Sequence, residues 1–111
     1  MELGNFSLSL AVADLAASQA FYAQLGFEAV GGRVEEGWLM LQNGDTRIGL
    51  FQGLFEANLI TWNPKDVRAI QARLQQAGIP IVASADHAGE GPAHVILADP
   101  DGNRILLDQL T

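Results

Sequence analysis

The stretch Asp14-Leu15-Ala16-Ala17-Ser18-Gln19-Ala20-Phe21-Tyr22-Ala23-Gln24-Leu25-Gly26-Phe27 decides the fold, because a second stretch of the chain repeats its pattern. The second stretch, Asp66–Ile79, lies over the first without a gap at an offset of 52 residues. A repeat at a fixed offset indicates a duplicated structural unit. We therefore predict one domain over residues 1–111, built from two copies of one unit at about residues 5–53 and 57–111.

Each repeated stretch has the pattern of a capped helix that follows a strand. Asp14 and Asp66 stand where an N-cap side chain accepts backbone N–H bonds, and Gly26 and Gly78 stand where a glycine ends a helix. Ahead of Asp14, apolar residues alternate with small ones, as in a half-buried strand. The apolar set is Phe6, Leu8, Leu10 and Val12, and Ile60 and Trp62 take the places of Leu8 and Leu10 in the second copy.

Three further strands are expected after each helix, so that each unit has the order βαβββ. In the first copy they span about residues 28–34, 38–42 and 47–51, and in the second copy about 81–84, 93–98 and 104–109. Asn43-Gly44-Asp45 is typical of a hairpin turn. Asp99–Asn103 predicts the last turn, with Gly102 at a positive φ. The polar, glycine-containing segment 86–92 is predicted to be a mobile loop.

The composition excludes several classes of function. A formal net charge of −7 argues against nucleic acid or an anionic membrane as a partner, because both bind basic patches. The chain has no cysteine, which excludes disulfides and thiolate metal sites and fits a cytoplasmic protein. No apolar run reaches the ~18 residues of a membrane helix, and the acidic N-terminus is not typical of a signal peptide.

Two motifs resemble the vicinal-oxygen-chelate superfamily, which contains the glyoxalases, the bleomycin-resistance proteins and the extradiol dioxygenases. They are Val12-x-Asp14-Leu15 with Ser18-x-x-Phe21-Tyr22-x-x-Leu25-Gly26-Phe27, and the closing turn Asp99-Pro100-Asp101-Gly102-Asn103. The resemblance covers nearly the whole chain. It implies an α+β, glyoxalase-like fold, in which two βαβββ modules form curved mixed sheets around a concave cavity.

The same resemblance implies where metal ligands would lie. Metal-dependent members place a histidine or glutamate in the first and the last strand of each module, and these four positions fall here on Ser7, Gly49, Leu59 and Leu106. Divalent metals need carboxylate, imidazole or similar donors, which glycine and leucine lack. We therefore expect no metal, no other cofactor, and neither glyoxalase isomerisation nor extradiol ring cleavage.

The alternation of strand residues predicts which side chains face the cavity. Trp38, Met40 and Phe51 are candidates for apolar ligand contact, with plain core packing as the alternative. Asp108 could hold a cationic ligand or act as a base, or could be a solvated charge at the rim. His94 is either structural or a ligand contact, and His87 is expected in solvent. The full candidate set is Ser7, Ser9, Trp38, Met40, Gly49, Phe51, Leu59, Thr61, His94, Leu106 and Asp108.

Three functions remain open from the sequence. The first is a metal-independent binding protein that sequesters or carries a small, partly aromatic organic molecule. The second is a lyase, isomerase or dioxygenase-like enzyme of the same superfamily: either a metal-free lyase or isomerase with Asp108 or His94 as the acting group, or a metalloenzyme with displaced ligands. The third is a structural or regulatory dimer without a small ligand. A homodimer is expected, because a single unit does not bury both faces of its sheet.

Overall fold

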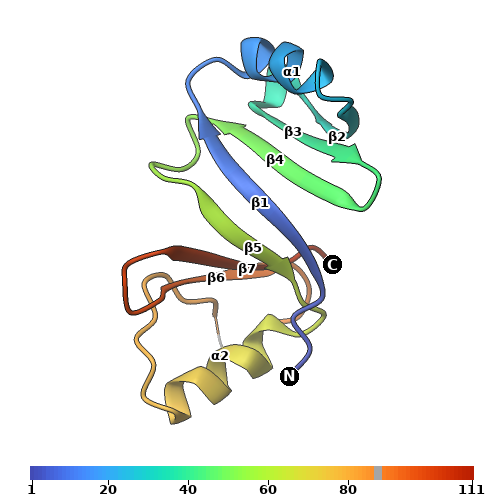
Figure 1. Ribbon diagram of the computed structural model, residues 1–111. Coiled ribbons are helices and arrows are strands. Elements are labelled where there is room, and N and C mark those ends of the chain that lie inside the picture. The colour runs from blue at the N-terminus through green and yellow to red at the C-terminus, as the bar shows by residue number, and fades with distance from the viewer. Residues whose placement is uncertain (87–88) are drawn as a thin grey trace. The chain divides into compact units, whose positions relative to one another are not determined.

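The computed structural model describes residues 1–86 and 89–111, so that His87 and its predicted role lie outside the described residues. The described chain divides into two compact units. One comprises residues 7–58, and the other comprises residues 1–6 together with residues 59–111 (Figure 1). The six N-terminal residues thus associate with the second half of the sequence.

The unit of residues 7–58 is a four-stranded sheet with one helix. Strand β1 runs parallel to β4, while β3 runs antiparallel to both β2 and β4, which gives the order β2-β3-β4-β1. The elements are β1 (Asn5–Val12), α1 (Leu15–Ala23), β2 (Glu28–Arg33), the short 3₁₀ helix η1 (Val34–Glu36), β3 (Trp38–Asn43) and β4 (Thr46–Gln52).

Alternation along the strands places the core of this unit on one face of the sheet, as the sequence predicts. Leu15 of α1 packs there on strand residues that are at most 7% exposed. These strand residues are Leu39, Leu41, Ile48 and Leu50, and Leu8, Leu10, Val12, Tyr22 and Phe27 pack around them. The opposite face of the sheet carries the small and aromatic residues that the sequence assigned to a ligand.

The second unit has three strands and one helix. Strand β7 lies between β5, to which it is parallel, and β6, to which it is antiparallel. The elements are β5 (Leu59–Asn63), α2 (Val67–Gln76), β6 (Ala93–Ala98) and β7 (Arg104–Gln109). Helix α2 contacts β6 and β7 (Figure 1). Its core comprises Val67, Ile70, Ala85, Val95 and Leu107.

Both helices begin and end in the same way, which confirms the predicted caps and glycine ends. Asp14 Oδ1 accepts a hydrogen bond from the Ala17 amide, and Asp66 Oδ1 accepts one from the Ala69 amide, both at 3.1 Å. Each helix then ends at a glycine with positive φ, Gly26 at 95° and Gly78 at 77°. The amide that follows each glycine bonds back to a carbonyl of the last turn, the arrangement known as a Schellman motif.

The predicted strand at residues 81–84 is wrong. This segment makes only an isolated antiparallel bridge, between Ala83 and Ile96. The reason lies in the side chain of Gln71, whose Nε2 donates to the Ala85 carbonyl at 3.0 Å and whose Oε1 accepts from the Ala85 amide at 2.7 Å. Because Gln71 takes both backbone groups of Ala85, that residue cannot extend a ladder with a strand.

Candidate functional site

The candidate site of the unit of residues 7–58 is the sheet face that points away from α1. The strand register pairs Ser9 with Gly49, Gly49 with Met40, and Phe51 with Trp38. Residues that stand opposite each other in neighbouring strands project to the same face, so these five share it. Ser7 joins them, because side chains two residues apart on a strand lie on one face.

Aromatic rings form a continuous wall on this face. Trp38 and Phe51 stack with ring centroids 6.4 Å apart and an interplanar angle of 11°. Phe55, which the sequence analysis missed, meets Phe51 edge-on at 5.1 Å. Only its spacing, four residues beyond Phe51, hinted at this contact. Trp38, Phe51 and Phe55 are partly exposed, and we call these three residues the aromatic wall.

Gly49 leaves a space in the sheet beside the aromatic wall, and the protein's own side chains enter that space. A Cβ atom at Gly49 would lie 2.6 Å from Cε2 of Phe51 and 3.6 Å from the terminal methyl of Met40. Both are ends of rotatable side chains rather than backbone. Gly49 is therefore the position that lets the Phe51 ring lie close to the sheet.

Two serines continue this face along β1, and each is only 2% exposed. Ser9 has an interaction partner. The Ser7 hydroxyl, in contrast, is buried and has no hydrogen-bond partner among the described residues. A buried polar group left unsatisfied costs about 1–3 kcal/mol, so such groups are rare and need an explanation.

The second unit carries the other candidates on the sheet face that points away from α2. Its register pairs Thr61 with Leu106 and His94 with Asp108, and Leu59 joins them by alternation. Leu59, Thr61 and Leu106 are at most 4% exposed. His94 is exposed and Asp108 is half-buried. The sequence did not decide the face of His94, and the register places it beside Asp108.

The half-buried position of Asp108 alters its acid–base behaviour. Burial raises the pKa of the Asp108 carboxyl, because an ion loses hydration there, while the nearby charge of His94 acts to lower it. Asn63 Nδ2 donates to the backbone carbonyl of Asp108 at 2.9 Å and holds the strand at this point. A carboxyl that is partly desolvated and faces a histidine is suited to exchange a proton or to bind a cation.

The repeat relates the aromatic wall to the ionisable pair. Each last strand ends in a glutamine that bonds the first amide of its helix, from Leu15 to Gln52 at 2.8 Å and from Val67 to Gln109 at 2.9 Å. Counting back one residue from these glutamines makes Phe51 the equivalent of Asp108. Their partners across the strand pair, Trp38 and His94, are then equivalent as well. The same position of the unit therefore carries an apolar pair in one copy and an ionisable pair in the other.

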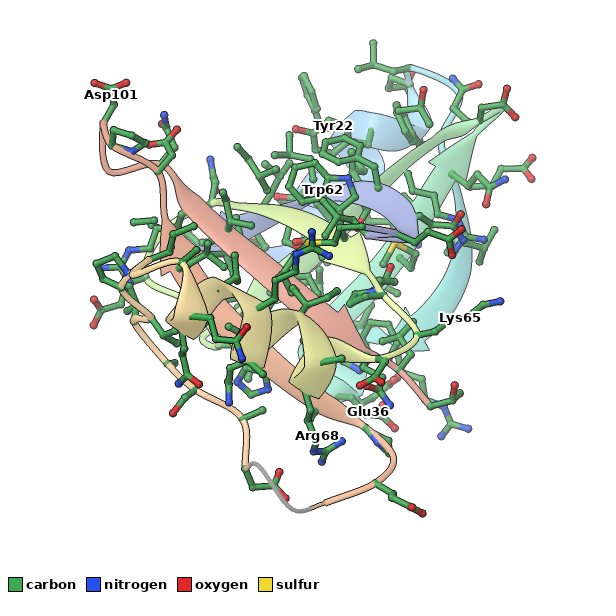
Figure 2. All side chains as sticks on the ribbon, turned by 90° about the horizontal axis from the view of Figure 1, so that it is seen from below. Tyr22, Glu36, Trp62, Lys65, Arg68 and Asp101 are labelled. Carbon is green, nitrogen blue, oxygen red and sulfur yellow. The ribbon has the colours of Figure 1, made fainter. Side chains whose placement is uncertain are left out.

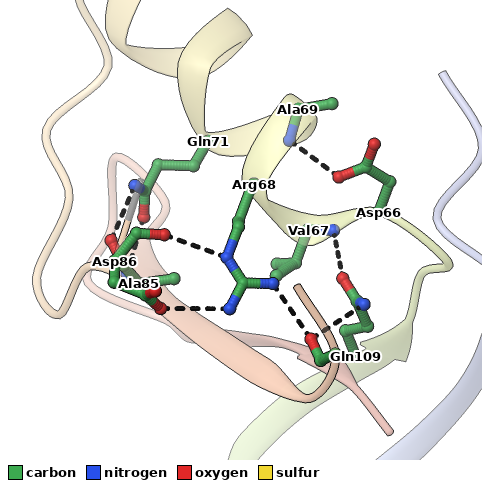
Figure 3. A network of polar contacts seen from close by, with 9 residues as sticks. Asp66, Val67, Arg68, Ala69, Gln71, Ala85, Asp86 and Gln109 are labelled. Atoms are coloured by element: carbon green, nitrogen blue, oxygen red, sulfur yellow. Dashed lines mark hydrogen bonds and ion pairs between the residues drawn. The ribbon is translucent and has the colours of Figure 1, made fainter. Parts of the chain in front are cut away.

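A polar network fixes the end of β7 next to Asp108 (Figure 3). Gln109 Nε2 and Arg68 Nη1 both donate to the carbonyl of Gly91 at 2.9 Å. Arg68 extends from α2 (Figure 2). It also binds Asp86, through the backbone carbonyl and through an ion pair of 3.0 Å (Figure 3). The hydrogen bond from Arg68 lowers the pKa of Asp86. Arg68 thus binds both Asp86 and Gly91.

Two surface hollows lie on the second unit, and neither is lined by any of the eleven predicted residues. One, of about 430 Å³, lies between the N-terminal segment and α2, where Glu2, Asn63 and Arg73 are among its lining residues. The other, of about 480 Å³, includes Lys65, Arg68 and Gln109 in its lining. Charged side chains of both signs line each hollow.

The comparison with known protein families matches a stretch of the chain that contains both motifs described above. Residues 6–107 match the family model described as the Glyoxalase/Bleomycin resistance protein/Dioxygenase superfamily. The chain belongs to this superfamily. No match was found among curated protein sequences.

Solved structures of the glyoxalase superfamily share the fold of this chain. A superfamily member from Vibrio splendidus has a TM-score of 0.71 at 19% identity, with 95% of this chain and 97% of the other covered. A methylmalonyl-CoA epimerase from Streptomyces coelicolor has a TM-score of 0.72 at 21% identity, with 99% of each chain covered.

A protein from Legionella pneumophila, described as an NAD-dependent benzaldehyde dehydrogenase, has a TM-score of 0.80 at 17% identity, with 96% and 99% covered. At these identities the likeness shows the fold, a glyoxalase-like α+β arrangement, and not the activity. Within the part of the chain that the structure describes, no helix is long and apolar enough to cross a membrane.

The residues at the superfamily's metal positions do not fit a metal ion. Gly49 and Leu106 bring no donor atom, and neither does Leu59. Ser7 brings only a hydroxyl. Across residues 1–86 and 89–111 no group of three or more histidine, cysteine, aspartate and glutamate side chains is placed to hold an ion. These positions therefore lack the carboxylate, imidazole or thiolate donors that a divalent metal requires.

Proposed function

We propose that the protein is a metal-independent binding protein that sequesters or carries a small, partly aromatic organic molecule. The observation that carries this proposal is the aromatic wall of Trp38, Phe51 and Phe55 on the sheet face opposite α1. The three rings are partly exposed, although strands β3 and β4, which bear Trp38 and Phe51, also supply buried core residues on the other face. Superfamily membership supports a small-molecule function of this general kind.

The aromatic wall favours flat, apolar ligands for a simple energetic reason. Burial of apolar ligand surface contributes about 25 cal/mol per Å², and stacked or edge-on ring contacts add about 0.5–1.5 kcal/mol each. Neither contribution requires a metal ion. Gly49 and the flexible Met40 next to the wall can accommodate ring systems of different width, since methionine adapts its shape at low cost.

The test combines elemental analysis with ligand titration after treatment with a chelator. The protein contains two tryptophans, so a Trp62→Phe variant leaves Trp38 as the only fluorescent reporter, placed directly on the aromatic wall. We expect compounds from a panel of aromatic metabolites and antibiotics to quench Trp38 and to raise the melting temperature without added metal. Phe51→Ala should abolish these effects.

Phe6→Ala is the matched control for Phe51→Ala. Phe6 is also a partly exposed strand aromatic beside a tryptophan, with its ring 5.6 Å from that of Trp62, but it belongs to the other unit. Removal of Phe6 should leave titration of the aromatic wall unchanged, provided that it is measured in a background that retains Trp38. Stoichiometric bound metal, or ligand binding that a chelator abolishes and a divalent ion restores, would overturn the metal-independent proposal.

A second candidate is an enzyme, a lyase or isomerase that moves a proton, and the pairing of His94 with Asp108 favours it. A desolvated carboxyl can act as a general base or acid when a substrate C–H or leaving group lies within reach. The matched variants are Asp108→Asn and His94→Gln. Exchange of a substrate proton for solvent deuterium in the wild type, lost in Asp108→Asn, would establish this activity, and unchanged exchange in Asp108→Asn would exclude Asp108 from it.

We also propose that the protein is a homodimer. Large apolar side chains remain exposed on the unit of residues 7–58, including Phe21 at 62%, Leu25 at 57% and Val30 at 53%. Exposed apolar side chains favour association when a symmetric copy covers them. Sedimentation equilibrium at micromolar concentration should give twice the chain mass of 11.9 kDa. A single 11.9 kDa species under these conditions would rule out the dimer.

A further inference from the structure

We infer that the hydroxyl of Ser7 is the group that selects the polar atom of the ligand, and that the ligand is an aromatic ring bearing a hydroxyl or carbonyl oxygen. This inference rests on the proposed function, because it assigns the chemistry of the ligand bound at the aromatic wall. It differs from that proposal in its evidence, which is a single hydrogen-bonding group rather than an apolar surface.

The first step is the isolation of the Ser7 hydroxyl. The side chain is 2% exposed, and its Oγ has no hydrogen-bond partner among the described residues. A serine hydroxyl offers one donor and two acceptor sites, all of which lose their water on burial. An alanine would pack in the same place without this cost. A serine at this position is therefore better explained by a partner that arrives from outside the chain.

The second step is the contrast with the neighbouring serine. Ser9 stands two residues further along the same face of β1 and is equally buried, yet Ser9 has an interaction partner within the protein. A serine buried on this face can therefore still have an interaction partner within the protein. The lack of a partner is a property of the Ser7 position.

The third step is the space beside the serines. Gly49 pairs with Ser9 across the strands, and the groups nearest to a Cβ at Gly49 are the ring of Phe51 and the methyl of Met40. Both side chains can turn aside without any change of the backbone. In the proposed bound state, Phe51 turns aside and packs against the ligand ring, which lies over Gly49 with its oxygen at Ser7. Movement of Phe51 would also unstack it from Trp38, which gives an optical signal.

The fourth step is the charge of the ligand's polar group. A serine hydroxyl can donate to a carbonyl and can both donate to and accept from a phenolic hydroxyl, so it recognises these neutral oxygens without a counter-ion. Ser9 and Ala11, which share the face with Ser7 along β1, are also uncharged. Arg47 shares this face on β4, but it is exposed and its Nε donates to Gln42 Oε1. The ligand class is thus a neutral oxygen-bearing aromatic.

The experiment compares phenol with toluene, two probes of nearly the same size that differ by a hydroxyl in place of a methyl group. Each is titrated by Trp38 fluorescence into three proteins that all carry Trp62→Phe: the parent, Ser7→Ala and Ser9→Ala. The parent should bind phenol at least about fivefold more tightly than toluene after correction for their different transfer from water, as one net hydrogen bond provides. Ser7→Ala should lose this preference and keep its affinity for toluene.

Stability measurements distinguish a ligand role from a structural one. Without a probe, Ser7→Ala should melt at the same temperature as the parent or higher, because an unsatisfied buried hydroxyl is removed. Ser9→Ala is the matched control and should melt lower than Ser7→Ala, because Ser9 has an interaction partner within the protein. A lower melting temperature for Ser7→Ala would show that Ser7 has a structural partner and would overturn the inference.

The binding results separate the two proposals. Equal preference for phenol in the parent and in Ser7→Ala would overturn the role of Ser7 and leave the aromatic wall intact. The same conclusion would follow if Phe51→Ala abolished the binding of both probes while Ser7→Ala kept the parent's ratio of phenol affinity to toluene affinity. Failure of both probes to bind the parent at millimolar concentration would count against the aromatic wall as a ligand site, and with it against the role of Ser7.

Discussion

Gln109 Oε1 accepts a hydrogen bond of 2.9 Å from the backbone amide of Val67, so that the end of the last strand holds the first turn of helix α2. The first amides of a helix have no partner within it, and a buried one must find a partner elsewhere. Gln109 meets this need and also donates to the Gly91 carbonyl. Its equivalent Gln52 makes only the first of these two bonds within the described chain, to Leu15.

Replacement of the two glutamines should therefore have unequal effects. Gln109→Ala leaves the buried amide of Val67 unsatisfied, while the Gly91 carbonyl keeps its bond from Arg68, and should lower the free energy of unfolding by about 1–3 kcal/mol. Gln52→Ala is the matched control; its side chain is exposed, so water can replace it, and we expect a loss of about 1 kcal/mol or less. Urea denaturation measures both. Equal losses would show that burial of Gln109 has no energetic role.

A side chain at Gly49 should disrupt the aromatic wall. A Cβ there meets the Phe51 ring at 2.6 Å, so Gly49→Ala must push Phe51 away from Trp38. We expect a destabilisation of about 1–3 kcal/mol, typical of overpacking, together with a change in Trp38 emission in the Trp62→Phe background. In a Phe51→Ala background the same substitution should cost much less. A double-mutant cycle without coupling would contradict this contact.

The carboxyl of Asp108 should make stability depend on pH. Its pKa is raised in the folded state, so the folded protein binds this proton more tightly than the unfolded chain. The stabilising contribution is fully present below the unfolded pKa, near 3.8, and is lost as the pH rises through the folded pKa. Asp108→Asn should therefore stabilise the protein at neutral pH, and its advantage over the wild type should shrink as the pH falls.

His94→Gln provides the companion measurement for Asp108. The charge of His94 acts to lower the pKa of Asp108, so removal of His94 should raise that pKa further and extend the pH-dependent range upward. Chemical denaturation at a series of pH values from acidic to neutral would measure the free energy of unfolding of both variants. Identical pH profiles for the wild type and Asp108→Asn would show that Asp108 is as well hydrated in the fold as in the unfolded chain.

The turn between β6 and β7 should be sensitive to backbone conformation rather than to packing. Gly102 has φ of 86°, and no atom lies within 4 Å of a Cβ built there. Gly102→Val should cost about 1–3 kcal/mol, because β-branched residues are strained at positive φ. Gly102→Asn should cost less, since asparagine tolerates this region better. Asp101 marks the exposed tip of this turn in Figure 2. An unchanged denaturation midpoint for Gly102→Val would contradict the prediction.

Features that depend on nearby residues could be predicted from the sequence. The caps at Asp14 and Asp66 and the glycine ends at Gly26 and Gly78 involve side chains and amides within one helical turn. The bounds of β6 and β7 follow from alternation and from the turn between them. Parity along the strands also gave the shared face of Ser9 and Gly49, because register and alternation fix it.

Features that depend on distant side chains could not be predicted. The segment at residues 81–84 has a strand-like composition, but Gln71, fourteen residues from Ala85, takes the hydrogen bonds a continued strand would need. Phe55 lies beyond the end of β4, where no alternation assigns a direction. The missing partner of Ser7 is decided by what surrounds its hydroxyl in space, and a sequence pattern identifies only the face on which it lies.

The bridge between Ala83 and Ile96 has a consequence for how this protein behaves at high concentration. Strand β6 is the outer strand of its half, and an outer strand with free amides and carbonyls is a template on which further strands can add, leading to aggregation and fibrils. Val82 and Ala83 donate to the Ile96 carbonyl, and the Ile96 amide donates to Ala83, so the middle of that template is already occupied. Gln71, by tethering Ala85 beside it, thus helps to protect the chain against aggregation.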